Sequence, residues 1–143
     1  MAVETNSKSF LGRGFHFPLS IDRQTGKFVM AEYEDDISEA VGIILKTNLG
    51  ERVMLPEFGS GVSNYIFAVN RLENDASFEA EIQNALEKFE PRIRDVKVEV
   101  RNDDGGKSAV TVNITYTVRT TNNLFNRVYP FYLLEGAGMG AIK

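Results

Sequence analysis

The chain has 143 residues and a formal net charge of −4, with no cysteine, no tryptophan and a single histidine. This composition excludes disulfides, thiolate nucleophiles, zinc–thiolate sites and iron–sulfur clusters, and one histidine cannot build a His-rich metal site. We therefore expect neither a metal nor another cofactor. The length predicts one domain, and 43% hydrophobic with 25% charged residues is typical of a soluble globular protein.

The charge and the hydropathy pattern also narrow the partners. A sequence pI near 5.1 argues against a nucleic-acid module, which ordinarily carries a basic face. The sequence has no run of 18 apolar residues, and residues 1–9 lack the apolar stretch of a signal peptide. We expect no nucleic-acid or membrane partner, and synthesis in the cytoplasm. The acids are concentrated in residues 31–93, which hold five bases and thirteen acids.

The predicted domain spans residues 12–135, between a polar N-terminal tail (1–11) and a Gly-rich C-terminal tail (136–143). Its first predicted element is a hairpin over residues 15–31, with a turn at Gly26. Alternation predicts one apolar strand face formed by Phe15, Phe17, Leu19 and Ile21. His16 lies on the opposite face, and we interpret it as a surface or interface histidine.

Two amphipathic helices follow, over residues 34–47 and 75–89, because apolar residues recur at helical spacing in both. The first begins with three acids, which the helix macrodipole favours, so we interpret them as a helix start and not as a cation site. The second ends before Pro91. Together the two helices carry most of the acidic residues of the stretch 31–93, and we expect these on their solvent faces.

The stretch 51–62 contains Pro56 and two glycines, which indicates an irregular loop. Because its apolar residues should pack, we expect this loop to be ordered; they are Val53, Met54, Leu55 and Phe58.

Alternating residues then predict strands over 95–102, 110–118 and 129–134, with a hairpin turn at 103–106. Helices and strands are segregated along the chain. The predicted fold class is therefore α+β: a small antiparallel or mixed sheet with two amphipathic helices packed on one face.

Two groups of residues have side chains that could carry a chemical or binding function. Glu51 and Glu57 could serve as the carboxylate pair of a glycosidase, although irregular chain between them fixes no distance. Glu90-Pro91-Arg92 is either a helix stop with two solvated charges or a rigid corner that presents a carboxylate and a guanidinium in fixed geometry. The residue pattern leaves both interpretations of this corner open.

Several motifs together carry a family resemblance. In chain order they are Gly14-Phe-His-Phe-Pro18, Gly50-Glu-Arg-Val-Met-Leu-Pro-Glu-Phe-Gly59, Glu90-Pro-Arg92 and Tyr129-Pro-Phe131. Over residues 12–133 the chain resembles the GPW-type phage baseplate wedge family, which also includes the type VI secretion protein TssE. Members are sheath-initiator components of contractile tails and contractile injection systems. Which of these particles is involved stays open.

The resemblance implies a structural protein without enzymatic activity, present in six copies in a tail or tail-like baseplate. Its implied partners are the wedge proteins, the sheath protein and hub or tube proteins. The wedge bundle would bind Glu90, Pro91 and Arg92, so we expect Arg92→Ala to leave the monomer folded but to abolish sheath attachment. The implied ordered loop contains Gly50, Glu51, Arg52, Pro56, Phe58 and Gly59. Strand addition would bring the sheath to the last strand, with Tyr129, Pro130 and Phe131 as candidates. The alternative function is a peptidoglycan-cleaving, lysozyme-like glycosidase, a name that some members carry.

Overall fold

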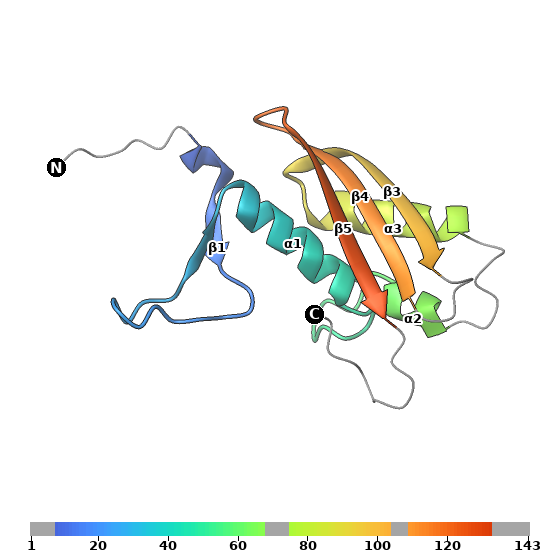
Figure 1. Cartoon of the computed structure of the whole chain (residues 1–143), viewed down its shortest axis with the longest axis horizontal. Helices are drawn as coiled ribbons and strands as arrows, with labels where there is room; N and C mark the ends of the chain where they lie inside the picture. Colours follow the sequence, from blue (N-terminus) through green and yellow to red (C-terminus); the bar gives the residue numbers. More distant parts are fainter. Residues whose placement is uncertain (1–7, 68–74, 104–108, 133–143) are drawn as a thin grey trace.

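The computed structural model describes residues 8–67, 75–103 and 109–132, and it has an α+β fold (Figure 1). A 3-10 turn (Ser9–Leu11) precedes a two-stranded antiparallel sheet of β1 (Arg13–Phe15) and β2 (Met30–Glu32). Three helices follow: α1 (Glu34–Lys46), α2 (Val62–Phe67) and α3 (Asp75–Phe89). An antiparallel sheet closes the chain, in the order β3 (Ile93–Asp103), β4 (Ala109–Val118) and β5 (Leu124–Tyr132).

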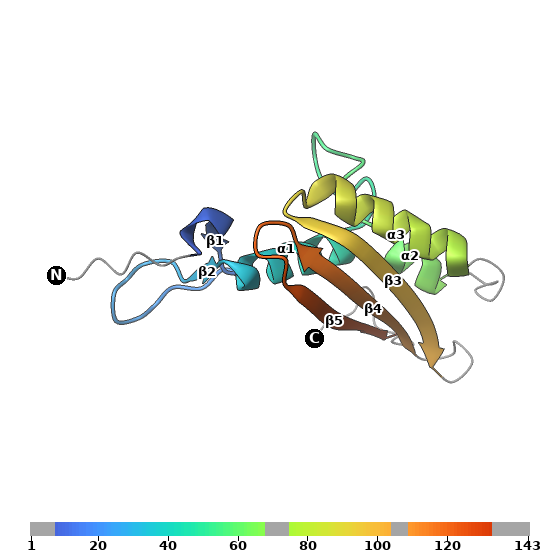
Figure 2. The same ribbon diagram turned by 90° about the horizontal axis from the view of Figure 1, so that it is seen from above.

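The core lies between the three-stranded sheet and helices α1 and α3, which run along one of its faces (Figure 2). Every second residue of β4 points into this layer, and the apolar stripe of α1 meets it from the other side. The prediction of two helices on one face of an antiparallel sheet is thus confirmed. The largest fully buried side chains are Tyr116, Ile37, Leu45, Ile82, Leu86, Ile93 and Ile114.

The starts of β3 and β5 differ from the predicted ones. β3 begins at Ile93, with a register shift between Arg94 and Lys97. β5 begins at Leu124, five residues before the predicted start, and pairs with β4 along its whole length. Polar residues at the start of β5 interrupt the apolar alternation, so the sequence pattern did not indicate this part of the strand. Most of the predicted turn 103–106 lies outside the described residues.

The stretch after α1 is irregular, as predicted, but it packs differently from the expectation. Val53 and Met54 are exposed at the loop tip, Met54 to 95%, so the prediction that they pack is wrong. Leu55 and Phe58 are half-buried. The chain also forms the short helix α2, which the sequence pattern did not indicate, and Val62 at its start is fully buried.

The N-terminal hairpin extends away from the rest of the molecule (Figures 1 and 2). Its regular strands are three residues long, and beyond them the two sides are joined by the bridge between Ile21 and Phe28 and by a few backbone hydrogen bonds, such as that from the Val29 amide to the Ser20 carbonyl (2.9 Å). We call residues 13–32 the N-terminal arm. The four residues of the predicted apolar face are all exposed: Phe15 62%, Phe17 58%, Leu19 61% and Ile21 59%.

Candidate functional site

The Glu90–Pro91–Arg92 corner joins the end of α3 to the start of β3. The Glu90 amide still donates to the Leu86 carbonyl (2.9 Å), and Pro91 then ends the helix. The Glu90 residue is only 4% exposed, whereas Pro91 is on the surface. A buried carboxylate needs a partner of opposite charge, and the next residue but one supplies it.

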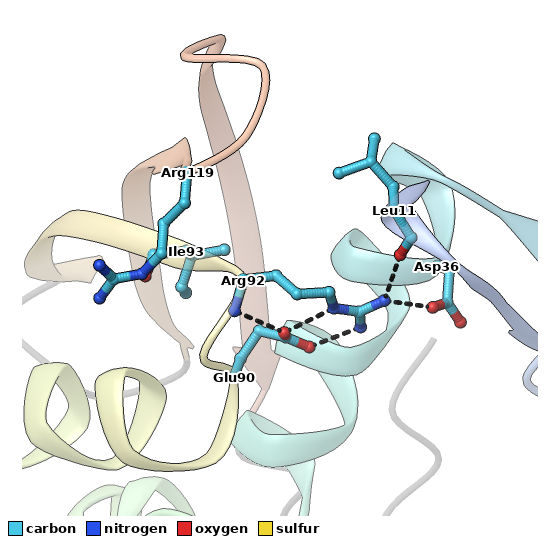
Figure 3. Close-up of polar contacts among 6 residues, drawn as sticks. All are labelled: Leu11, Asp36, Glu90, Arg92, Ile93 and Arg119. Carbon is cyan, nitrogen blue, oxygen red and sulfur yellow. Dashed lines mark hydrogen bonds and ion pairs between the residues drawn. The ribbon is translucent and has the colours of Figure 1, made fainter. Parts of the chain in front are cut away.

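The Arg92 guanidinium donates two parallel hydrogen bonds to the Glu90 carboxylate, from Nε to Oε1 and from Nη2 to Oε2, each 2.7 Å long (Figure 3). Its Nη1 donates to Asp36 Oδ2 (2.6 Å) and to the Leu11 carbonyl (3.2 Å). The hydrogen bond to Glu90, followed by that to Asp36, raises the pKa of Arg92 above its ordinary value, although partial burial opposes the rise. The group is therefore a permanent cation with its donors engaged inside the chain.

These contacts tie three distant segments together: the turn before the arm, the first turn of α1 and the corner. Gly14 of β1 fits the same place, because a Cβ there would lie 2.5 Å from Asp36 Oδ1. The corner therefore has a fixed geometry, but the Glu90 carboxylate is buried and not presented at the surface. Its charges face one another, and Arg92 leaves only 31% of its side chain exposed.

The ordered loop is held by its own backbone and by α1. The Gly50 amide donates to the Pro56 carbonyl (2.7 Å), and the Asn48 amide donates to Glu51 Oε2 (2.8 Å). Gly59 has a φ of 116°, and a Cβ there would overlap the Thr47 carbonyl oxygen, so glycine is required.

A groove of about 520 Å³ separates this loop from α1. Arg52 lies over the Phe58 ring (4.7 Å to the centroid), and Phe58 meets Phe89 edge-on at 5.0 Å. Because Phe89 directly precedes Glu90, the groove reaches the end of α3 at which the corner begins. The groove is lined by Ala40, Ile43, Ile44, Thr47, Glu51, Arg52, Phe58 and Phe89.

The three candidate residues of the last strand lie in β5. Tyr129 points toward α1, where its hydroxyl donates to the Ser38 carbonyl (3.3 Å) and burial raises its pKa. Phe131 is buried in the core, and Pro130 is half-buried. Their sheath-facing role stays a prediction, and it would have to use the strand backbone. The exposed apolar side chains of β5 are Leu124, Val128 and Tyr132.

Two acidic residues of α1 have contacts that sequence reasoning missed. Asp36 binds Arg92, and Glu39 pairs with His16 Nδ1 and accepts the Phe17 amide (3.0 Å). Glu39 therefore holds the base of the arm, and Asp36 holds the corner. Their spacing of three residues, which places both on one side of a helix, was the signal available in the sequence.

Within the described ranges, no cluster of three or more acidic or histidine side chains could hold a metal ion. None of the helices in the part of the chain described here combines the length and the hydropathy needed to cross a bilayer.

The fold and the corner can now be compared with known proteins. Residues 31–123 match the family described as baseplate wedge protein gp25. No curated protein matches the sequence. A crystal structure from Geobacter sulfurreducens, with the provisional name tail lysozyme, is 41% identical; the match covers 76% of this chain and 98% of that one, with a TM-score of 0.64.

Two solved structures with low sequence identity share the fold. A chain of the baseplate complex of the type VI secretion system has a TM-score of 0.58 at 15% identity, covering 68% of this chain and 91% of that one. A chain of the anti-feeding prophage baseplate has a TM-score of 0.57 at 19% identity, covering 90% and 92%. The chain thus shares its fold with chains of these two baseplates. The chain belongs to the baseplate wedge protein gp25 family, and the family resemblance read from its motifs is confirmed.

Proposed function

We propose that this baseplate component is a structural adaptor that links the wedge proteins to the first sheath ring and templates sheath assembly. Membership of the wedge family supports its place in a baseplate. The observation that carries the adaptor role is the edge of β5, which ends the three-stranded sheet. An unpaired strand edge presents backbone donors and acceptors to an incoming strand.

The two edges of this sheet differ in how well they would accept a strand. β3 has a register shift at its start, where Asp95 adopts a positive φ of 51°, and charged side chains line its outer face. Such bulges and charges protect an edge from pairing. β5 pairs with β4 over nine consecutive residues without a shift, and its outer side chains include Leu124 and Val128. The β5 edge is therefore the proposed sheath-binding edge.

The corner is the proposed contact with the wedge proteins. Its guanidinium is already fixed by Glu90 and Asp36, so docking would not cost the ordering of a long side chain. Exposed Pro91 and the exposed part of Arg92 would form the contact. The groove beside Phe58 and Phe89 adjoins this surface and would extend it.

We further propose that the chain has no enzymatic activity. The name of the Geobacter protein raises the alternative of peptidoglycan cleavage. Glu51 and Glu57 are both exposed on the loop, and one Glu51 oxygen accepts the Asn48 amide. A glycosidase needs two carboxylates that face one cleft, and only Glu51 lines the groove, where Arg52 is also present and Glu57 is not. Purified protein should leave cell-wall suspensions turbid; clearing that Glu51→Gln or Glu57→Gln abolishes would establish the enzyme instead.

The sheath role is tested by Val128→Lys, which places a charge beside the proposed pairing edge. Thr117→Lys is the control, because it puts the same side chain on the same face of the central strand. In electron micrographs of particles from producing cells, we expect Val128→Lys to give baseplates without sheaths and Thr117→Lys to give sheathed particles. Full-length sheaths on Val128→Lys baseplates would overturn the proposal.

The assembly state follows from this role. We propose synthesis and assembly in the cytoplasm, six copies for each particle, and contacts with wedge, sheath and hub or tube proteins. Quantitative mass spectrometry of purified particles should give a fixed ratio of this chain to the wedge proteins. A chain absent from purified baseplates would contradict the proposed location.

A further inference from the structure

We propose that the N-terminal arm (residues 13–32) is a second docking element, which inserts into an apolar groove with an acidic rim on another protein of the assembly. The inference rests on the proposed function for the location of that partner. The chemistry of the arm is independent of it, and the arm is remote from the β5 edge (Figure 1).

The arm exposes far more apolar surface than its length warrants. It carries six of the thirteen exposed large hydrophobic side chains in the described ranges, namely Phe15, Phe17, Leu19, Ile21, Phe28 and Val29. Contiguous apolar surface beyond a few hundred Å² marks an interaction site on a soluble protein. A surface this apolar on a projecting hairpin favours a partner that covers it.

The arm is also formed in advance of any partner. Asp22 accepts hydrogen bonds from the Gln24 amide (2.9 Å) and the Thr25 hydroxyl (2.8 Å), and the Gly26 amide closes the turn on the Asp22 carbonyl (2.8 Å). Phe15 and Phe28 meet edge-on at 5.4 Å across the hairpin. Binding would therefore order few new dihedral angles, which lowers its entropic cost.

The charges on the arm indicate the charge that the rim of the partner's groove should carry. Lys8 pairs with Glu34 and Arg13 with Glu32, but Arg23 and Lys27 at the tip have no ion-pair partner among the residues that the structure describes. The nearby Asp22 carboxylate is occupied by its own turn. The tip is thus positively charged, and an acidic rim would complement it.

A groove fits the arm better than a flat bilayer or a second copy of this chain does. Phe28 and Val29 are consecutive in an extended segment, so their exposed side chains point to opposite sides. A bilayer surface would cover one side only. In the groove on this chain Arg52 offsets the charge of Glu51, so a second copy does not offer the acidic rim that Arg23 and Lys27 would complement.

Two pairs of variants test the proposal in particles purified from producing cells. The double variants Leu19→Ser/Ile21→Ser and Arg23→Glu/Lys27→Glu change the arm. Their matched controls are Val53→Ser/Met54→Ser, which change apolar residues that are even more exposed, and Lys46→Glu/Lys97→Glu, which make the same change of charge on the body. The amount of chain in purified baseplates, relative to the lysate, is measured by quantitative immunoblotting.

We expect each arm variant to lower incorporation by about tenfold or more. Leu19→Ser/Ile21→Ser removes apolar anchors, and Arg23→Glu/Lys27→Glu brings like charges against the acidic rim. The controls should incorporate normally, and all four variants should keep the melting temperature of the wild type. Wild-type incorporation of the arm variants, or equal losses in arm variants and controls, would overturn the proposal. Sheathless Val128→Lys particles alongside normally incorporated arm variants would refute the arm proposal alone.

The identity of the partner is tested with a photo-reactive benzoylphenylalanine in place of Phe17. Irradiated particles should give a cross-link to a different protein, at a peptide with apolar residues flanked by Asp or Glu. A cross-link between two copies of this chain would overturn the inference. Co-flotation of the purified chain with phosphatidylserine vesicles, lost in Arg23→Glu/Lys27→Glu, would also overturn it in favour of a membrane.

Discussion

The N-terminal arm and the body of the molecule use the same sequence pattern with opposite results. Residues 15–21 and residues 110–118 both alternate apolar with other residues. β4 lies between two strands and beneath helices, so Val112 and Ile114 are fully buried. The arm has one partner strand and no covering layer, so Leu19 is 61% exposed. Alternation therefore specifies a face, but not whether the same chain covers it.

The largest expected effect separates these two regions directly. Ile114→Ala should lower the free energy of unfolding by about 2–5 kcal/mol, because it leaves a cavity in the core. Leu19→Ala should change it by less than about 0.5 kcal/mol, because the side chain is already in water. Urea denaturation of both variants measures the difference. Similar losses would mean that the arm packs on the body in solution.

The same contrast explains how much of the fold was readable in the sequence. The helices α1 and α3 and the strands β3 and β4 were predicted within about two residues, because each has a long apolar stripe of one period. The start of β5 was missed, since Asn126 and Arg127 interrupt the pattern there. α2 was missed because it has six residues and follows a Gly-rich stretch.

The candidate site was located by sequence but its contacts were not. The Glu90–Pro91–Arg92 motif allowed either a helix stop with solvated charges or a rigid corner, and the structure shows a local pair between Glu90 and Arg92. The contacts of Arg92 to Asp36 and Leu11 span 56 and 81 residues, and only the folded chain brings these together. The role of the corner in binding wedge proteins stays a prediction.

The second effect concerns the junction between arm and body. Arg92→Ala should lower the free energy of unfolding by about 3 kcal/mol, because it leaves Glu90 buried without its cation. The expectation that this variant leaves the monomer folded stays a prediction, and the structure adds that the variant should be less stable than the wild type. Arg92→Lys keeps the charge but not the paired hydrogen bonds, and it should lose less. Thermal unfolding measures both, and an unchanged melting temperature for Arg92→Ala would contradict the internal role of the network.

The third effect compares one glycine in each region. Gly59→Ala should cost about 2 kcal/mol, because the new Cβ meets the Thr47 carbonyl and the backbone is strained. Gly26 in the arm also has a positive φ (68°), but the space around it is open. Gly26→Ala should therefore cost about 1 kcal/mol of local strain and leave the melting temperature of the body unchanged. Equal shifts in the melting temperature would show that the two regions unfold together.

The smallest effect is a pH response confined to the tip of the arm. Hydrogen bonds from the Gln24 amide, first, and from the Thr25 hydroxyl hold the pKa of Asp22 below its ordinary value of 3.8. A carboxylate whose pKa is lowered by folding stabilises the turn fully above pH 3.8 and loses this contribution as the pH falls through the lowered pKa.

The chemical shift of the Gln24 amide, followed by NMR during acid titration, reports this transition. Its midpoint should lie below pH 3.8 and rise toward 3.8 in Thr25→Ala, which removes one of the two hydrogen bonds. Asp22→Ala should abolish the transition. Since Asp22 is far from the core, the amides of β4 should not titrate with the same midpoint. A shared midpoint would show that the arm and the body are coupled. The apolar arm would then be part of the cooperative fold and not a free docking surface.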